Sequence, residues 1–334
     1  MNHEGDIVLI TGATAGIGQE LARQLVSEFQ DRITICLACR NIKKANATKE
    51  MLMSLCSTAK VDILTLDTSD AKSVIAVAEE IKRRYSYLNH LFLNAGIMPI
   101  TQFDWSHFVS GFRSFSSFIN MFTTGEGLII QNDSVTNDGL QSVFATNLFG
   151  HYLLISELED YLAASNKMTH IVWTSSSAAN RASFSLDNMQ HVNGKDPYGS
   201  SKHAIDLLNV SLNEKLNSKG IYSHVTCPGL VMTNLTYGIM SPNSWYLLYP
   251  IIALLRMCVS NLNITAANGC TALQWLYNQV PTKLEYKCKY FSRCSFLGRS
   301  FVETRELPVE STASNNLREK LDQLIKEVKS KLRE

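Results

Sequence analysis

Short apolar segments alternate with segments of helical periodicity along the first two thirds of the chain. Ile7–Thr11 leads into a glycine-rich turn, and a helical pattern follows from Gln19 to Phe29. After the third apolar segment, apolar residues recur at the spacing of one helix face, at Val74, Val77, Ala78 and Ile81. The apolar segments are predicted to be strands, at Ile7–Thr11, Ile33–Cys39, Val61–Leu66, Leu91–Leu93, His170–Thr174 and His224–Thr226.

Most of these segments are predominantly apolar, which is typical of strands that are buried on both faces of a parallel sheet. Strand and helix patterns in alternation indicate βαβ units, and the crossovers in such units are right-handed. The predicted fold class is therefore α/β, a doubly wound parallel sheet of the Rossmann type, in a single domain with apolar insertions.

Two apolar segments fall outside this alternation. Thr101–Asn132 carries five apolar residues on one helix face, which would lie in the core, on the wall of a substrate tunnel or on a membrane-facing surface. Trp245–Leu255 has eleven residues, fewer than the ~20 needed to cross a bilayer, and fits an interfacial anchor, a lid or a buried helix. The face in the first segment consists of Phe108, Phe112, Phe115, Ile119 and Phe122.

A third segment, from about Asn315, is predicted to be a heavily charged helix with an apolar stripe. We therefore divide the chain into a domain over residues 1–300, with a substrate-side segment at about 230–285, and a charged helical tail over residues 301–334. A helix of this kind is usually a solvated surface, and partner binding is the alternative. The stripe consists of Leu317, Leu321, Leu324, Val328 and Leu332.

Composition narrows the class of protein. The chain has 334 residues, 45% of them hydrophobic, and a formal net charge of +1, so it can bury one large core and offers no basic stripe for nucleic acid. The first residues lead directly into a strand, so no signal peptide is expected. Cys36 and Cys39 have the spacing of a metal or redox pair, but on a strand their side chains point to opposite faces. We predict buried thiols, no metal site and a reduced, cytosol-facing protein.

The strongest chemical signal is Tyr198-x-x-x-Lys202, with the serines 175–177 about twenty residues upstream. Residues four apart share a helix face, so the phenol and the ammonium can act together. A free phenol has a pKa of about 10, and a neighbouring cation favours the phenolate. The pattern predicts acid–base chemistry on a carbonyl/alcohol pair.

A second signal is the turn that contains Gly12, Gly16 and Gly18, directly after the first strand. A strand that leads through such a turn into a helix places backbone N–H groups against a phosphate, so the turn predicts a dinucleotide. At the end of the second strand, where an acidic residue would select NAD, the chain has Arg40. The guanidinium suits a 2′-phosphate, so we predict NADPH/NADP+.

Several motifs occur in an order and spacing that resemble the short-chain dehydrogenase/reductase family. Longer stretches such as Asn147–His151 and Phe184–Leu186 resemble the steroid reductases within that family, and this likeness runs from about residue 6 to 300. The family motifs are Thr11-Gly12-x-x-x-Gly16-x-Gly18, Asn94-Ala95-Gly96, Asn147, Ser176, Tyr198-x-x-x-Lys202 and Pro228-Gly229.

The resemblance implies a role for each matching residue. Tyr198 would protonate the developing alkoxide, and Lys202 would hold the nicotinamide ribose and lower the pKa of the phenol. Ser176 would bind the substrate oxygen, and Asn147 would hold a water that links Lys202 to solvent. The cofactor would contact Gly12, Thr14, Gly16, Ile17, Gly18, Arg40, Asp67, Thr68, Asn94, Ala95, Gly96, Tyr198, Lys202, Pro228, Gly229, Val231 and Thr233, with Asp67 and Thr68 beside the adenine.

Two serines are open to more than one interpretation. The catalytic serine is Ser176 or Ser177, and we favour Ser176 because it aligns with the end of the family's strand. Ser185 lies in a stretch shared with the steroid reductases, so it would contact substrate or, by the alternative, cap the turn before Leu186.

The resemblance implies reduction of the 3-keto group of a sterol, with a 17-keto group as a further target, as in sterol biosynthesis. Between Asn94 and Asn147 lie 52 residues, about twice what the family core needs. The additional residues are rich in apolar side chains, which fits a hydrophobic substrate taken from the cytosolic face of the endoplasmic reticulum membrane. A homodimer or association with other sterol-biosynthesis enzymes would fit the same setting. The alternatives are a reductase of retinal or another lipid carbonyl, and a non-catalytic NADP-binding scaffold, which would not need an intact catalytic set.

Overall fold

The computed structural model describes residues 3–103, 129–232, 262–295 and 297–333. The phenylalanine-rich face at residues 108–122 and the segment Trp245–Leu255 lie outside the described residues, and so does Thr233. The predictions for them therefore stay predictions.

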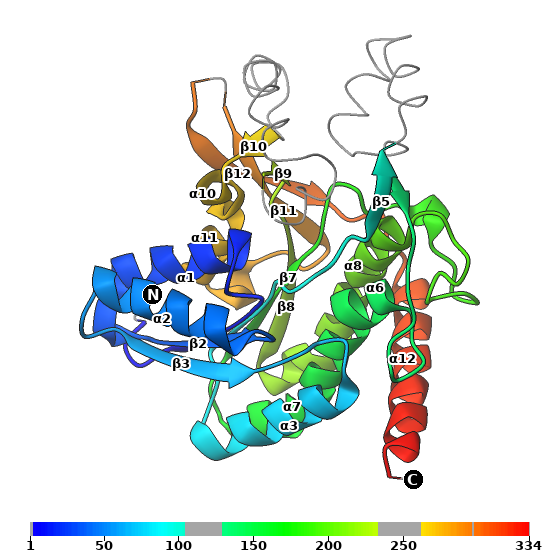
Figure 1. Ribbon diagram of the computed structural model, residues 1–334, viewed down its shortest axis with the longest axis horizontal. Coiled ribbons are helices and arrows are strands. Elements are labelled where there is room, and N and C mark those ends of the chain that lie inside the picture. Colours follow the sequence, from blue (N-terminus) through cyan, green and yellow to red (C-terminus); the bar gives the residue numbers. More distant parts are fainter. Residues whose placement is uncertain (1–2, 104–128, 233–261, 296, 334) are drawn as a thin grey trace.

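An eight-stranded sheet forms the centre of the molecule, in the order β12-β11-β8-β7-β4-β1-β2-β3 (Figure 1). Neighbouring strands are parallel except for the antiparallel pair β11–β12. All six predicted strands are present. The sheet strands are β1 (Ile7–Thr11), β2 (Thr34–Cys39), β3 (Lys60–Thr65), β4 (His90–Leu93), β7 (Thr169–Thr174), β8 (Ile221–Cys227), β11 (Cys288–Cys294) and β12 (Ser300–Glu306), and two small pairs join β5 (Ile100–Phe103) to β6 (Ile129–Gln131) and β9 (Leu230–Val231) to β10 (Leu262–Ile264).

Helices cover both faces of this sheet, which confirms the doubly wound fold. One core cluster joins the sheet to α1, α2 and α11, and the other joins it to α3, α7, α8 and α12. Figure 1 shows α1 and α2 on the side of β2 and β3 opposite to α3 and α7. The helices are α1 (Gly16–Phe29), α2 (Ile42–Leu55), α3 (Ala71–Arg84), α6 (Ser142–Phe144), α7 (Gly150–Ala164), α8 (Pro197–Leu216), α10 (Ala266–Gly269), α11 (Thr271–Tyr277) and α12 (Ser311–Lys331).

Helix α3 shows how local sequence sets an element. The Asp70 side chain accepts from the backbone N–H groups of Lys72 and Ser73 and caps the first turn. Three basic residues lie in the last turn, where the negative end of the helix dipole favours them. The face predicted from periodicity, which includes Val74 and Ile81, is buried against the sheet.

The cysteines of β2 behave as the strand pattern predicts. Cys36 packs in the cluster on one face of the sheet and Cys39 in the cluster on the other. Burial raises the pKa of Cys36 to about 12 and that of Cys39 to about 11. Both are therefore thiols near neutral pH, on opposite sides of the strand.

The C-terminal region contains structure that the periodicity did not show. Residues 301–306, assigned to the tail from the sequence, form most of β12 and pair with β11. The charged helix then runs as α12, and its residues Leu317, Leu321, Ile325 and Val328 are buried in the core cluster that also contains α8. The apolar stripe is therefore covered by the chain's own fold.

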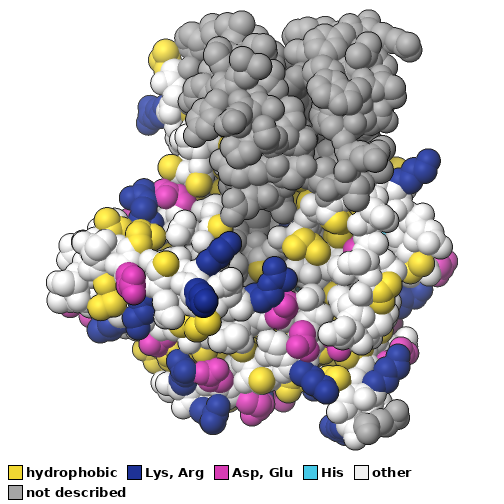
Figure 2. All heavy atoms as spheres, in the orientation of Figure 1, with side chains coloured by type: hydrophobic (Ala, Val, Ile, Leu, Met, Phe, Trp, Pro, Cys, Tyr) yellow, Lys and Arg dark blue, Asp and Glu magenta, His cyan; other side chains and the backbone are white. Residues whose placement is uncertain are grey.

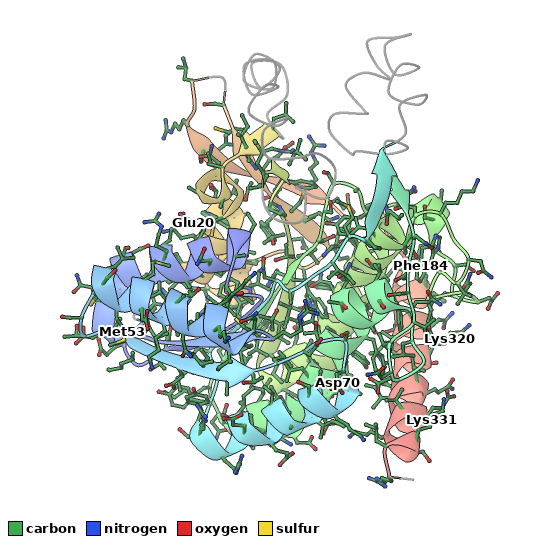
Figure 3. The ribbon with its side chains drawn as sticks, viewed as in Figure 1. Glu20, Met53, Asp70, Phe184, Lys320 and Lys331 are labelled. Atoms are coloured by element: carbon green, nitrogen blue, oxygen red, sulfur yellow. The ribbon has the colours of Figure 1, made fainter. Side chains whose placement is uncertain are left out.

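Helix α12 also holds the loop that precedes α8. Lys320 donates to the carbonyl oxygen of Leu186 (2.8 Å), and the Tyr152 hydroxyl of α7 donates to Asp322. Figure 3 labels Lys320 and Phe184 at this junction, with Lys331 further along the helix. On the face drawn in Figure 2, positive and negative side chains are interspersed over the described surface.

The order of the strands determines where a ligand can enter. The chain moves from β1 outward through β2 and β3, and then crosses to the other side of β1 to form β4. Binding crevices in such sheets lie at this reversal, beyond the carboxyl ends of the strands. The turns after Thr11 and Leu93 therefore flank the expected site. Among the described residues, no helix is both long and apolar enough to cross a membrane.

Candidate active site

Tyr198 and Lys202 lie in the first two turns of α8. Asp196 caps the helix by accepting from the N–H of Gly199 (2.9 Å), and Gln131 accepts from the N–H of Tyr198 (3.0 Å). The Lys202 ammonium lies 5.4 Å from the centre of the Tyr198 ring and donates to the carbonyl oxygen of Thr174 (2.7 Å) at the end of β7. The structure therefore places the predicted pair on one helix face, against the carboxyl end of the sheet.

Ser176 completes this group from the loop after β7. Its hydroxyl hydrogen-bonds the hydroxyl of Tyr198, and it accepts from the N–H of Ala178 (3.0 Å). The hydrogen bond to Tyr198 favours Ser176 over Ser177 as the serine that acts with the tyrosine. The role itself stays a prediction.

Burial dominates the ionisation of the pair. It raises the pKa of Tyr198 to about 12, partly offset by the hydrogen bond from Ser176, so our expectation of a lowered phenol pKa is not met. Burial also lowers the pKa of Lys202 to about 8. In this state the phenol is protonated near neutral pH, and the lysine titrates close to neutrality.

Asn147 lies in a short π-helical turn, Ala145–Phe149, just before α7. Its Oδ1 accepts from the N–H of Ile97 (2.8 Å), and its Nδ2 donates to the carbonyl oxygen of Ile97 (3.1 Å) and to Ser201 (3.1 Å). Turns of this kind are frequent at functional sites. Asn147 therefore ties the loop after β4, at Ile97, to α8 at Ser201. The proton path through Asn147 stays a prediction.

The glycine turn after β1 packs tightly on the end of β4. Gly12 and Gly16 have positive φ angles of 67° and 56°, and a Cβ on Gly18 would lie 2.6 Å from Nδ2 of Asn94. The N–H groups of Asn94 and Ala95 both donate to the Thr11 hydroxyl (2.9 Å each). No side chain caps α1 at Ala15, so the backbone N–H groups at its start can bind a phosphate.

The predicted adenine end lies at the ends of β2 and β3. The Arg40 guanidinium is 3.8 Å from the carboxylate of Asp67, and 74% of its side chain is exposed. Thr68 is buried, and a Cβ on Gly150 would lie 1.9 Å from its carbonyl oxygen, so Gly150 lets α7 approach this loop. The three residues predicted to border the adenine end of the cofactor are thus adjacent, namely Arg40, Asp67 and Thr68.

The predicted nicotinamide end is partly described. Gly229 has a φ of 70°, and β9 with Val231 pairs with β10. A Cβ on Gly269 would lie 2.5 Å from Val231 and 2.7 Å from Ile17. Both of these residues were predicted to contact the cofactor, and they meet at α10. Sequence reasoning missed Gly269 and also Asn263, whose amide donates to the carbonyl oxygen of Pro228 (2.6 Å).

Ser185 and Thr14 lie in local turns. The Ser185 hydroxyl accepts from the N–H of Asp187 (3.3 Å), and the side chain is exposed. This favours the capping interpretation that we gave as the alternative. Thr14 hydrogen-bonds the thiol of Cys39, so it joins the glycine turn to the end of β2.

Three more residues behind the site were not predicted. Ser175 donates to Asp206 (2.8 Å), and the Lys289 ammonium lies 2.6 Å from the same carboxylate. Asp206 is one turn after Lys202, so helix periodicity could have pointed to it. Lys289 is 83 residues away in sequence from Asp206, on a strand that we did not predict.

Acid is expected to weaken the folded state through buried histidines. His151 lies beside the glycine turn, with its Nε2 2.9 Å from the Thr11 hydroxyl, and His224 is buried in β8. Burial lowers the pKa of each from 6.5 to about 4. Between these values the unfolded chain binds more protons, so stability is full above 6.5 and falls as the pH drops, by about 3 kcal/mol per histidine.

Urea unfolding at about pH 7 and about pH 5 measures this loss. His224→Gln removes one of these histidines and should reduce the difference in unfolding free energy between the two pH values. An equal difference in the variant and the original protein would show that His224 is not one of the groups responsible.

Comparison with known proteins assigns this geometry to a family. The family model described as short chain dehydrogenase matches residues 6–243. The 3-keto-steroid reductase/17-beta-hydroxysteroid dehydrogenase 7 of Rattus norvegicus is 47% identical over 323 residues, which cover 97% of this chain and 96% of the rat protein. The Homo sapiens protein of the same name is 44% identical over 97% of this chain and 94% of its own length.

A solved structure shows the same fold at low sequence identity. The 7α-hydroxysteroid dehydrogenase complexed with NADH and 7-oxo glycochenodeoxycholic acid is 18% identical, with a TM-score of 0.57, and the match covers 82% of this chain and 89% of that one. The family model spans well over half of the chain, and the rat and human proteins match nearly all of it. Fold, site geometry and similarity agree, and the chain belongs to the short-chain dehydrogenase/reductase family.

Proposed function

We propose that the protein reduces the 3-keto group of a sterol or steroid to the alcohol with NADPH. The observation that carries the proposal is the hydrogen bond between Ser176 and Tyr198 beside the buried Lys202. The relatives at 44–47% identity bear the name 3-keto-steroid reductase, which supports this substrate class, and the second half of their name supports a 17-keto group as a further target.

The residues of the site fit proton transfer to a ketone oxygen that becomes an alkoxide. The nicotinamide cofactor supplies the hydride. Tyr198 is protonated near neutral pH, so its hydroxyl can donate the proton. Ser176 would orient that hydroxyl and contact the same oxygen. Lys202 offers a positive charge near the ring, which stabilises the phenolate left behind.

The turn after β1 fits a dinucleotide. Gly12 and Gly16 have positive φ angles, and Gly18 approaches Asn94 closely. No side chain caps the start of α1, so its backbone N–H groups are available there. Gly12, Gly16 and Gly18 would hold the pyrophosphate there, and Asp67 and Thr68 would border the adenine. Arg40 is exposed at the end of β2, which supports a contact with the 2′-phosphate of NADPH.

Replacing Arg40 with leucine tests the choice of cofactor. The guanidinium would bind the 2′-phosphate, so Arg40→Leu should raise the Kd for NADPH by roughly tenfold or more and leave the Kd for NADH unchanged. Fluorescence titration of each dinucleotide measures both constants, and Arg299→Leu, an exposed arginine at the opposite edge of the sheet, is the control. An original protein that binds NADH as tightly as NADPH would rule out this selectivity.

Product analysis tests the reaction. The purified protein is incubated with NADPH and, in parallel, a 3-keto-sterol, a 17-keto-steroid, retinal and a small polar ketone. The proposal expects the 3-hydroxy sterol as the main product. Ready turnover of retinal or of the polar ketone, without reduction of the 3-keto-sterol, would contradict it.

We also propose that the protein meets this substrate at the cytosolic face of the endoplasmic reticulum membrane. A sterol ketone is insoluble in water, and the aromatic, apolar sequence Trp245–Leu255 suits a headgroup boundary. Sedimentation with phosphatidylcholine vesicles measures the association. Protein that stays entirely in the supernatant would contradict this part.

A further inference from the structure

A buried ion pair lies behind the proposed catalytic group. Lys289 on β11 and Asp206 on α8 are 5% and 4% exposed, and the ammonium lies 2.6 Å from Oδ2 of the carboxylate. Removing two charges from water costs several kcal/mol per ion, and a buried pair is often no more stabilising than apolar side chains of similar size. Stability alone therefore does not explain this pair.

Each member of the pair hydrogen-bonds a different part of the Ser175-Ser176 step. The Lys289 ammonium donates to the carbonyl oxygen of Ser176 (3.0 Å). On the other side, the Ser175 hydroxyl donates to Oδ1 of Asp206 (2.8 Å). The Ser176 carbonyl and the Ser175 side chain are thus held by the pair, while the Ser176 hydroxyl contacts Tyr198.

The pair also sets the charge around Lys202. The titratable groups that act on Lys202 are Asp206 and Tyr198 on its own helix, Lys289 on β11, Cys227 at the end of β8 and His151 on α7. Burial lowers the pKa of Lys202 most, Asp206 raises it, and Lys289 lowers it. Asp206 lies one helix turn after Lys202 on α8 and carries the ion pair with Lys289, so two buried charges of opposite sign act on Lys202 in opposite directions.

We propose that Lys289 and Asp206 are positioning residues, which hold the Ser176 peptide against Tyr198 and keep the charge next to Lys202 balanced. The first part rests on the proposed function, because it matters only if Ser176 and Tyr198 act on a substrate. The second part concerns an equilibrium of the protein itself and can be measured without substrate.

Lysine labelled with ¹³C at Cε allows the titration of Lys202 to be followed by NMR, with its signal assigned by Lys202→Arg. Asp206→Asn removes the negative charge, so the Lys202 midpoint should fall, on the order of one pH unit. Lys289→Met removes the positive charge and leaves Asp206 unopposed, so the midpoint should rise. Shifts of opposite sign are the expected result.

The steady-state readout uses the same variants. Lys289→Met loses the bond to the Ser176 carbonyl, so kcat should fall by roughly tenfold or more with little change in KM, and the pH profile of kcat should move in the direction of the NMR titration. Lys289→Met leaves the buried Asp206 carboxylate without its partner, which can prevent folding. The double variant, Asp206→Asn with Lys289→Met, leaves no unpaired buried charge and should fold even in that case. Its Lys202 midpoint should return toward that of the original protein.

Lys215→Met is the matched control, because Lys215 lies on the same helix and pairs with Glu159 (2.7 Å) away from the site. It should move neither the Lys202 titration nor kcat. Equal Lys202 midpoints in the original protein and all folded variants, together with unchanged pH profiles, would overturn the proposal. If no ketone is reduced but the midpoints move as expected, the proposed function fails and the charge balance stands.

Discussion

Tyr198→Phe is expected to lower kcat for ketone reduction by about 10²- to 10⁴-fold and to leave the protein folded. The change removes one hydroxyl, which is the proposed proton donor and the partner of Ser176. The ring stays, so its contact with Lys202 is kept. The loss of NADPH absorbance with a 3-keto-sterol measures kcat, and thermal unfolding checks the fold.

Tyr161→Phe is a close control for this experiment. Burial raises the pKa of Tyr161 to about 12, as it does for Tyr198, and its hydroxyl donates to the carbonyl oxygen of Tyr85 (3.1 Å) on another part of the protein. Its loss should leave kcat unchanged. Reductase activity that survives nearly intact in Tyr198→Phe would show that the proton comes from another group.

The second large effect concerns stability. Leu321→Asp is expected to lower the free energy of unfolding by about 3–5 kcal/mol, because it deletes a fully buried leucine and places a charge in an apolar site without a partner. Leu321 belongs to the face of α12 that is buried in the core cluster shared with α8. Urea unfolding measures the change.

Lys326→Asp places the same charge on the exposed side of α12 and should cost far less. If Leu321→Asp were as stable as this control, α12 would contribute little to the stability of the domain, as a separate tail would. A large loss would make the helix part of the folded domain.

The strands were predictable because buried parallel strands leave a local signal. Runs such as Ile7–Thr11 and His170–Thr174 are mostly apolar, and each is found in the sheet. The site was predictable for a similar reason, because Tyr198 and Lys202 share a helix face and the glycines follow a strand directly. Spacing along the chain carries this information.

What was missed depends on contacts between distant segments. Strand β12 pairs with β11, and Lys289 reaches Ser176 across 113 positions of sequence. The periodicity of apolar residues along the chain cannot predict a contact between segments so far apart in sequence. The pKa of Tyr198 moved opposite to expectation for a related reason, since adjacency to Lys202 is visible in the sequence but the depth of burial is not.

The position of Lys289 has a consequence for how the protein is made. Ribosomes synthesise a chain from its N-terminus, and domains fold as their segments emerge. The glycine turn and Tyr198 are translated long before β11, yet the side chain that holds the Ser176 peptide belongs to β11. A nascent chain can thus assemble the first half of the fold early, while Ser176, the proposed catalytic serine, gains its last support only near the end of translation.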